Sequence, residues 1–166
     1  KSSVLGDNFA ADTRIPLMSV TGSTAVGRRV GAIVGKRLGK TILELGGNNA
    51  VIISQHANLD MTMQSVVFGS VGTCGQRCTS TRRLIIHESV YDAVKTRLTA
   101  AYESISSRIG NPLKKETLVG PLVDTIAVNN FLHAIAEVQK EGGKLVYGGV
   151  SLTGEKYPNG TYVLPA

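Results

Sequence analysis

The sequence predicts an α/β protein built on parallel sheets. Short apolar runs of strand length alternate with longer segments of helical periodicity, and glycine-rich turns separate them. The chain has 166 residues, of which 42% are apolar and 18% charged, so there is enough apolar material for a packed core. We find no internal repeat and no low-complexity stretch.

The first predicted group is a strand, a turn, a helix and a second strand. Residues 17–20 form a short apolar run, and Thr21-Gly22-Ser23-Thr24 follows it as a turn. Apolar side chains then recur at helical spacing, at Val26, Val30, Ile33, Val34 and Leu38. Glycines at every fourth position from Gly27 to Gly39 indicate a helix packed closely on a sheet, with Gly39 near its C-terminal cap. Residues 41–45 are predicted to be a buried strand, which completes half of a doubly wound layer.

The rest of the chain continues the alternation. Strands are predicted at 50–53, 83–87 and 144–147, and helices at about 60–69, 89–109 and 125–141. Asp60 is the expected cap of the first of these helices. A loop of small residues, 72–79, lies between that helix and the next strand.

Charge and composition exclude several classes of protein. The net charge is +6, but the basic residues are dispersed and only 5% of residues are aromatic, so we expect no nucleic-acid partner. No apolar run reaches membrane-spanning length and no signal peptide opens the chain, so we expect no membrane association. Two cysteines are too few for a disulfide framework, which favours a cytosolic compartment. Lys1 in place of a start methionine indicates a piece of a larger protein.

The turn from Gly22 to Gly27 is the first candidate site. Two glycines flank the start of a helix, where backbone N–H groups and the helix dipole favour a phosphate. The spacing imitates part of a P-loop, but Arg28 and Arg29 stand where Lys and Ser/Thr are required, which argues against an NTPase. A capped helix with a tight turn and no ligand is an equally good interpretation.

The second candidate is Cys78 in Gly75-Gln76-Arg77-Cys78. A cysteine beside an arginine in a glycine-containing loop has surroundings that lower a thiol pKa and expose a nucleophile. The alternatives are an inert small side chain, a metal site or a cysteine protease. Cys74, Cys78 and His87 fall short of four metal ligands, and no histidine stands in a protease signature, so no metal is predicted.

The third candidate is Glu44 in Glu44-Leu45-Gly46-Gly47. It ends a predicted strand, at the edge where open α/β sheets bind ligands. Partial burial would raise its pKa and suit it to act as a general base. A solvated glutamate at a strand end is the alternative.

Together these motifs resemble the aldehyde dehydrogenase superfamily. The match lies in Thr-Gly-Ser-Thr-x-x-Gly, Glu-Leu-Gly-Gly and Gly-Gln-x-Cys, in that order, and covers the whole chain as roughly the middle third of such an enzyme. Longer stretches, such as Glu-Leu-Gly-Gly-Asn-Asn-Ala and Gly-Gln-Arg-Cys-Thr, are most similar to its α-aminoadipic semialdehyde dehydrogenase branch.

The resemblance implies domains, roles and partners. Residues 1–44 would belong to a Rossmann-like NAD(P)-binding domain and 45–166 to the catalytic domain. Cys78 would attack the aldehyde, Glu44 would activate the water that hydrolyses the thioester, and Arg77 and Thr79 would contact the substrate. The cofactor, NAD or NADP, would contact Gly22, Ser23, Val26, Gly27 and Leu45. The resemblance also implies a homotetramer in the cytoplasm, or in the mitochondrial matrix of a eukaryote.

The same resemblance leaves alternatives open. Other aliphatic or betaine-type aldehydes are alternative substrates, and a crystallin-like structural member without turnover is an alternative function. Retention of both Cys78 and Glu44 counts against the latter. The oxyanion-binding asparagine and the upstream half of the cofactor domain fall outside these 166 residues, so we expect the fragment alone to be inactive.

Overall fold

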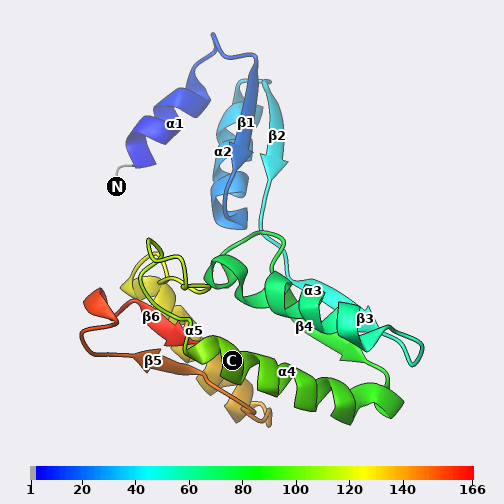
Figure 1. Ribbon diagram of the computed structural model, residues 1–166. Helices are drawn as coiled ribbons and strands as arrows, with labels where there is room; N and C mark the ends of the chain where they lie inside the picture. Colours follow the sequence, from blue (N-terminus) through cyan, green and yellow to red (C-terminus); the bar gives the residue numbers. More distant parts are fainter. Residues whose placement is uncertain (1–2) are drawn as a thin grey trace. The chain divides into compact units, whose positions relative to one another are not determined.

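The computed structural model describes residues 3–166 and divides into two compact units, Lys1–Gly47 and Asn48–Ala166. Figure 1 labels the helices and strands of each unit. Both contain parallel strand pairs with helices packed on them, which confirms the predicted α/β class. No helix within residues 3–166 is long and apolar enough to cross a membrane.

The first unit contains the predicted strand, helix and strand. Its elements are α1 (Ser3–Ala11), β1 (Leu17–Thr21), α2 (Thr24–Lys36) and β2 (Lys40–Glu44). Strands β1 and β2 are parallel, with Thr21 opposite Glu44 at their carboxyl ends. Ala10, Met18 and Val34 form the core, so α1, which the sequence did not predict, packs with β1 and α2.

Strand β2 is less buried than predicted. Leu43 approaches α2, where a Cβ on Gly31 would lie 3.7 Å from its Cδ1. Ile42, on the other face, is 50% exposed. The expectation of a buried strand was wrong for this unit, because α2 covers only one face of the two-stranded sheet.

Helix α2 begins and ends with specific capping bonds. The Oγ of Ser23 accepts a hydrogen bond from the Val26 N–H at 3.2 Å. At the other end the N–H of Gly39 donates to the Val34 carbonyl at 3.0 Å, and Leu38 has a φ of 58°. Gly39 therefore lies near the cap as predicted, but Leu38 takes the left-handed position that glycine usually fills.

The glycines of α2 do not all serve close packing. A Cβ on Gly27 would lie 2.5 Å from both Cδ atoms of Leu45, whereas one on Gly35 would meet no atom within 4 Å. The predicted close approach is confirmed at Gly27 and does not extend to Gly35.

This difference predicts opposite effects of the same substitution in the full-length protein. Gly27→Ala forces Leu45 to move and is expected to lower the free energy of unfolding by about 1–2 kcal/mol. Gly35→Ala, the matched control, gains helix propensity and should raise it by up to about 1 kcal/mol. Urea unfolding of both variants checks this, and equal effects would contradict the packing difference.

The second unit carries the remaining elements. They are β3 (Asn49–Ile53), α3 (Leu59–Val71), η1 (Gly72–Gly75), β4 (Thr81–Ile86), η2 (Glu88–Val90), α4 (Tyr91–Ser106), α5 (Thr125–Lys140), β5 (Val150–Leu152), η3 (Pro158–Gly160) and β6 (Tyr162–Leu164). Strands β3 and β4 are parallel, and β5 and β6 are antiparallel. Asn58 caps α3 by accepting from Asp60 and Met61 N–H groups, so the predicted cap, Asp60, was wrong by two residues.

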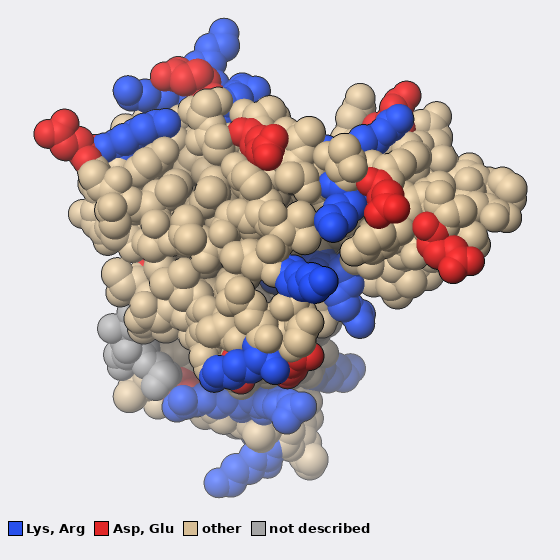
Figure 2. Space-filling view, turned by 90° about the horizontal axis from the view of Figure 1, so that it is seen from below, with Lys and Arg blue, Asp and Glu red and all other residues tan. Residues whose placement is uncertain are grey.

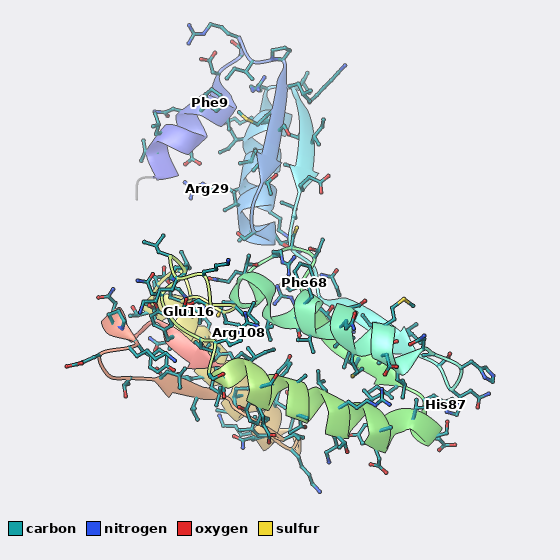
Figure 3. The ribbon with its side chains drawn as sticks, in the orientation of Figure 1. Phe9, Arg29, Phe68, His87, Arg108 and Glu116 are labelled. Carbon is teal, nitrogen blue, oxygen red and sulfur yellow. The ribbon has the colours of Figure 1, made fainter. Side chains whose placement is uncertain are left out.

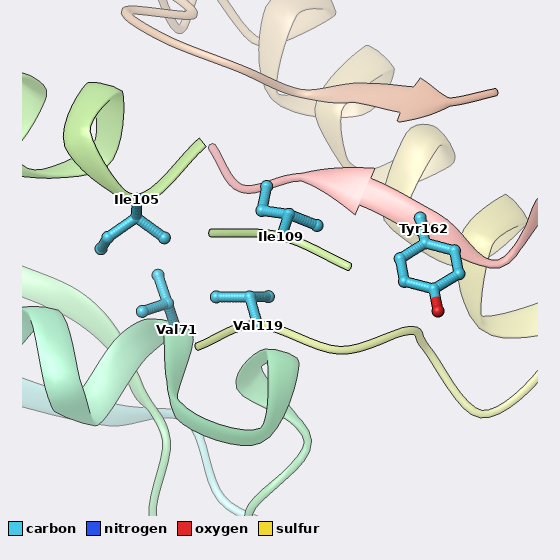
Figure 4. Packing of buried hydrophobic residues seen from close by; sticks show 5 residues of the cluster. All are labelled: Val71, Ile105, Ile109, Val119 and Tyr162. Carbon is cyan, nitrogen blue, oxygen red and sulfur yellow. The ribbon is translucent and has the colours of Figure 1, made fainter. Parts of the chain in front are cut away.

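Two apolar clusters hold this unit together. Ile53, Met63 and Val94 join β3, α3 and α4 in one of them. The other, drawn in Figure 4, joins the end of α3, the end of α4 and β6, through Val71, Ile105, Ile109, Val119 and Tyr162. Val71 belongs to this second cluster, so the helix that leads into the 72–79 loop is held by packing at its last residue.

Two predicted elements differ in the structure. Residues 144–147 form no strand, and the short hairpin of β5 and β6 follows instead, after Gly148 and Gly149 with positive φ. The helix predicted to reach 109 ends at Ser106, and Ile109 forms an isolated bridge with Val119. The alternation of apolar and polar residues predicts strands of four residues or more, so strands of three residues are not found from the sequence.

Basic side chains do not form one continuous surface in the view of Figure 2. Lys and Arg residues are spread across the face shown there and lie among Asp and Glu residues. Ion pairs of the described residues include Arg29 with Asp7 and Arg97 with Asp60. These pairs leave the net charge of +6 unchanged, but they place some of the basic side chains directly beside acidic ones.

Candidate active site

The first unit brings six predicted residues to one edge of its sheet. The carboxyl ends of β1 and β2 meet there, and the Gly22 N–H donates to the Glu44 carbonyl at 3.0 Å. Ser23 and Val26 begin α2 directly after this turn, and Gly27 packs against Leu45. Residues that the sequence predicts on separate motifs are thus neighbours.

The start of α2 offers N–H groups to a ligand. The Ser23 side chain caps Val26, and its carbonyl accepts from the Gly27 N–H at 2.9 Å. The N–H groups of Thr24 and Ala25, in the first turn, have no acceptor within the helix. The dipole of this 13-residue helix adds positive potential at the same end. This arrangement fits a pyrophosphate, and the 45% exposed Val26 leaves an apolar surface beside it.

Glu44 is exposed in its unit. The partial burial expected from its place at the strand end is therefore not present in the described structure. The physical reason is the same as for Ile42: the helices of this unit cover one face of the sheet, and Ile42 and Glu44 lie on the other. Its role as a base stays a prediction.

Cys78 lies at the corner of a tight turn in the second unit. The Ser80 N–H donates to the Arg77 carbonyl at 3.1 Å, and the Arg77 N–H donates to the Ser80 Oγ at 3.1 Å. Ser80 is 1% exposed, so the turn is anchored at its base, while Cys78 at its tip is exposed. An accessible thiol on an anchored turn is the arrangement that a nucleophile needs.

Cys74 has a different environment from Cys78. It is half-buried, and burial raises the pKa of its thiol above the usual value. Its backbone is left-handed, with φ 55°, as is that of Thr73, with φ 51°. The burial supports the expectation that Cys74 is the packed cysteine.

Arg77 turns its guanidinium toward the end of α3. Its Nη2 donates to the Phe68 carbonyl at 2.8 Å, and the guanidinium lies 4.6 Å from the centre of the Phe68 ring. Phe68 is on α3 in Figure 3. A cation at a helix C-terminus is favourable, so Arg77 also stabilises α3, a contact that the sequence did not reveal. Its Nε is buried without a hydrogen-bond partner, so only N–H groups on the two terminal nitrogens are left for a substrate.

Gln76 holds the loop to a distant segment. Its Nε2 donates to the Pro121 carbonyl at 3.3 Å, and its Oε1 accepts from the Val123 N–H at 2.9 Å. The sequence does not reveal this role, because the partners are 45 and 47 residues away. The Thr79 side chain lies exposed beside Cys78.

The sequence is similar to that of known aldehyde dehydrogenases. Residues 1–166 match the aldehyde dehydrogenase family. The chain is 49% identical over 161 residues to aldehyde dehydrogenase family 7 member A1 of Pisum sativum, covering 97% of this chain and 30% of the relative. It is 50% identical over 145 residues to α-aminoadipic semialdehyde dehydrogenase of Bos taurus, covering 87% of this chain and 26% of the relative. The chain thus spans under a third of these relatives.

Solved structures show the same fold. HpcC of Thermus thermophilus aligns with a TM-score of 0.90 at 30% identity, over 96% of this chain and 32% of that one. PnpE in complex with nicotinamide adenine dinucleotide aligns with a TM-score of 0.90 at 32% identity, over the same shares. Motifs, fold and relatives agree, and the chain belongs to the aldehyde dehydrogenase family.

Proposed function

We propose that the protein containing this chain oxidises an aldehyde to a carboxylic acid with NAD(P)⁺, through a thioester on Cys78. One observation carries the proposal: Cys78 is exposed at the tip of an anchored turn, while the other cysteine is half-buried with a raised thiol pKa. The names of the relatives agree with the reaction class. Residues 1–44 would belong to the cofactor domain and 45–166 to the catalytic domain.

The chemistry starts at Cys78. Its thiolate adds to the carbonyl carbon, which forms a C–S bond and places negative charge on the carbonyl oxygen. NAD(P)⁺, held by Gly22, Ser23 and the start of α2, would supply the hydride acceptor for that carbon. The product is a thioester. Glu44 then takes a proton from a water molecule, whose oxygen attacks the thioester; the C–S bond breaks and the thiolate is restored.

The first unit would hold the cofactor. Gly22 and Ser23, with the N–H groups at the start of α2, fit its pyrophosphate, and a Cβ on Gly22 would meet only Val26, at 3.6 Å. Val26 would lie by the adenine, and Leu45, held against Gly27, near the nicotinamide. Solved relatives include complexes with NAD⁺, which supports a nicotinamide dinucleotide.

The proposed substrate is α-aminoadipic semialdehyde, in lysine degradation. About 50% identity to dehydrogenases named for it supports this. Arg77 would hold its carboxylate, and Thr79 would contact the same end. We further propose a homotetramer in the cytoplasm or the mitochondrial matrix.

Steady-state kinetics of the full-length protein test the function. With NAD⁺ or NADP⁺, α-aminoadipic semialdehyde should give a higher kcat/KM than octanal or betaine aldehyde. A thioester trapped by acid quench should map to the peptide that carries Cys78. A protein that oxidises none of the three would contradict the proposal and favour a structural role.

Arg77→Ala tests the substrate assignment. If Arg77 holds a carboxylate, its loss should raise KM for the acidic semialdehyde by roughly one to two decades, the cost of a charge-assisted hydrogen bond, and spare octanal. Steady-state kinetics with the two aldehydes measure the difference.

Equal losses with both aldehydes would contradict the carboxylate contact. They would show instead that Arg77 acts on the thiol or through its bond to the Phe68 carbonyl. The matched control is Arg83→Ala, because Arg83 also binds a backbone carbonyl, that of Asn48, at 2.8 Å. Arg83→Ala should change KM for the acidic semialdehyde and for octanal by the same factor.

A further inference from the structure

The side chain of Asn49 binds the turn that carries Cys78. Its Nδ2 donates to the Cys78 carbonyl at 2.7 Å and to the Ser80 carbonyl at 3.1 Å. An asparagine amide nitrogen carries two N–H donors, so the two carbonyls match its full capacity. Asn49 precedes Cys78 by 29 residues, and although it lies in the Glu-Leu-Gly-Gly-Asn-Asn-Ala stretch, the sequence assigns it no role.

An irregularity in the sheet occurs at Asn49. Strand β3 pairs Asn49 with Thr81 but its next residue, Ala50, with Arg83, so β4 contains one extra residue at this point. Such bulges redirect a side chain or end regular pairing, often beside active sites. The bulge is directly next to the residue that binds both carbonyls of the turn.

The bond to the Cys78 carbonyl restrains the peptide between Cys78 and Thr79, the part of the turn that can change orientation. Cys78 and Thr79 are its central residues, since the Ser80 N–H closes it on the Arg77 carbonyl. The peptide between two central residues can flip between type I and type II turns, and type II needs a positive φ at the second of them. Thr79 has no positive φ here. A flip would turn the Cys78 carbonyl away from Asn49 and break a 2.7 Å hydrogen bond.

We propose that Asn49 is a positioning residue for Cys78, which holds the peptide between Cys78 and Thr79 in one orientation. Through this peptide it sets ψ of Cys78 and the direction of the carbonyl dipole next to the thiol. Asn49 touches no reacting atom in this assignment. The inference rests on the proposed function of Cys78 as nucleophile.

Variants of the full-length enzyme test this assignment. Asn49→Ala removes both bonds, and Asn49→Ser keeps one shorter donor. The matched control is Asn48→Ala, because Asn48 contributes its backbone carbonyl to Arg83 and that carbonyl survives the substitution. Three quantities are measured: kcat and KM for aldehyde and NAD⁺, the pH dependence of Cys78 alkylation by iodoacetamide followed on its peptide, and thermal unfolding.

Asn49→Ala is expected to lower kcat about ten- to a hundred-fold, because two hydrogen bonds that orient the peptide of the nucleophile are lost. KM for NAD⁺ should stay unchanged. The midpoint of the alkylation profile should move from that of the wild type. Asn49→Ser should give a smaller loss in the same direction, and Asn48→Ala should behave as wild type.

A lower unfolding temperature with unchanged kcat and alkylation profile would overturn the proposal, because a purely structural residue gives that result. If Asn49→Ala does not fold, the same comparison is made with Asn49→Ser. If the wild type oxidises no aldehyde, the proposed function fails, while the alkylation profiles still decide whether Asn49 positions Cys78.

Discussion

Replacing Cys78 by serine in the full-length enzyme is expected to abolish aldehyde oxidation, with a loss of at least about 10³-fold in kcat. A serine hydroxyl is far less ionised than a thiol at neutral pH and forms an ester in place of the more reactive thioester. Cys74→Ser should retain most of the activity, because Cys74 is half-buried and burial raises its thiol pKa. Reduced-cofactor formation followed by absorbance measures both.

The two cysteine variants carry the same substitution, Cys→Ser, at two positions of one loop. Both residues lie in the loop after α3, four positions apart, so a general disturbance of the loop would affect them alike. A comparable loss from Cys74→Ser would overturn the assignment of Cys78 as the nucleophile. Alkylation of the intact enzyme should also reach the exposed Cys78 before Cys74.

Glu44→Gln is expected to separate the two halves of the reaction. Thioester formation does not need the base that activates water, so the variant should form one equivalent of reduced cofactor per site in a rapid burst. Steady turnover should then fall about 10²- to 10⁴-fold, the usual contribution of a general base. Rapid-mixing absorbance measures the burst and the slow phase together.

Loss of the burst itself would contradict this division. It would show that Glu44 is needed to deprotonate Cys78 rather than to activate water. Glu88→Gln is the control, because Glu88 is also exposed and starts a short helix away from the motifs. It should leave both phases unchanged.

Local patterns in the sequence determined most of the elements. The strand, turn, helix and strand at residues 17–44 follow from apolar spacing and glycine placement, and the structure contains all of them. The α5 helix begins at Thr125 as predicted, because Asp124 caps it. Candidate residues of the first unit meet at one sheet edge because parallel strands end together.

Other features depended on contacts that a linear pattern does not contain. Helix α1 forms with a weak apolar face, and its Ala10 is buried against Met18 and Val34. The hairpin of β5 and β6 has strands of three residues and depends on pairing Val150 with Leu164. The exposure of Glu44 follows from which faces of a sheet are covered, which spacing along one strand does not reveal.

By itself the sequence determined the family and the α/β class, and it predicted the residues that would carry the chemistry, because motifs and hydrophobic periods are local. Only the tertiary structure decided how the Cys78 loop is held: Asn49 on its carbonyls, Gln76 on residues 121–123, and Arg77 on the end of α3. The non-local bonds of Asn49 and Gln76 join residues 29 to 47 positions apart. Their geometry exists only once the chain has folded, since a side-chain hydrogen bond needs both partners within about 3 Å.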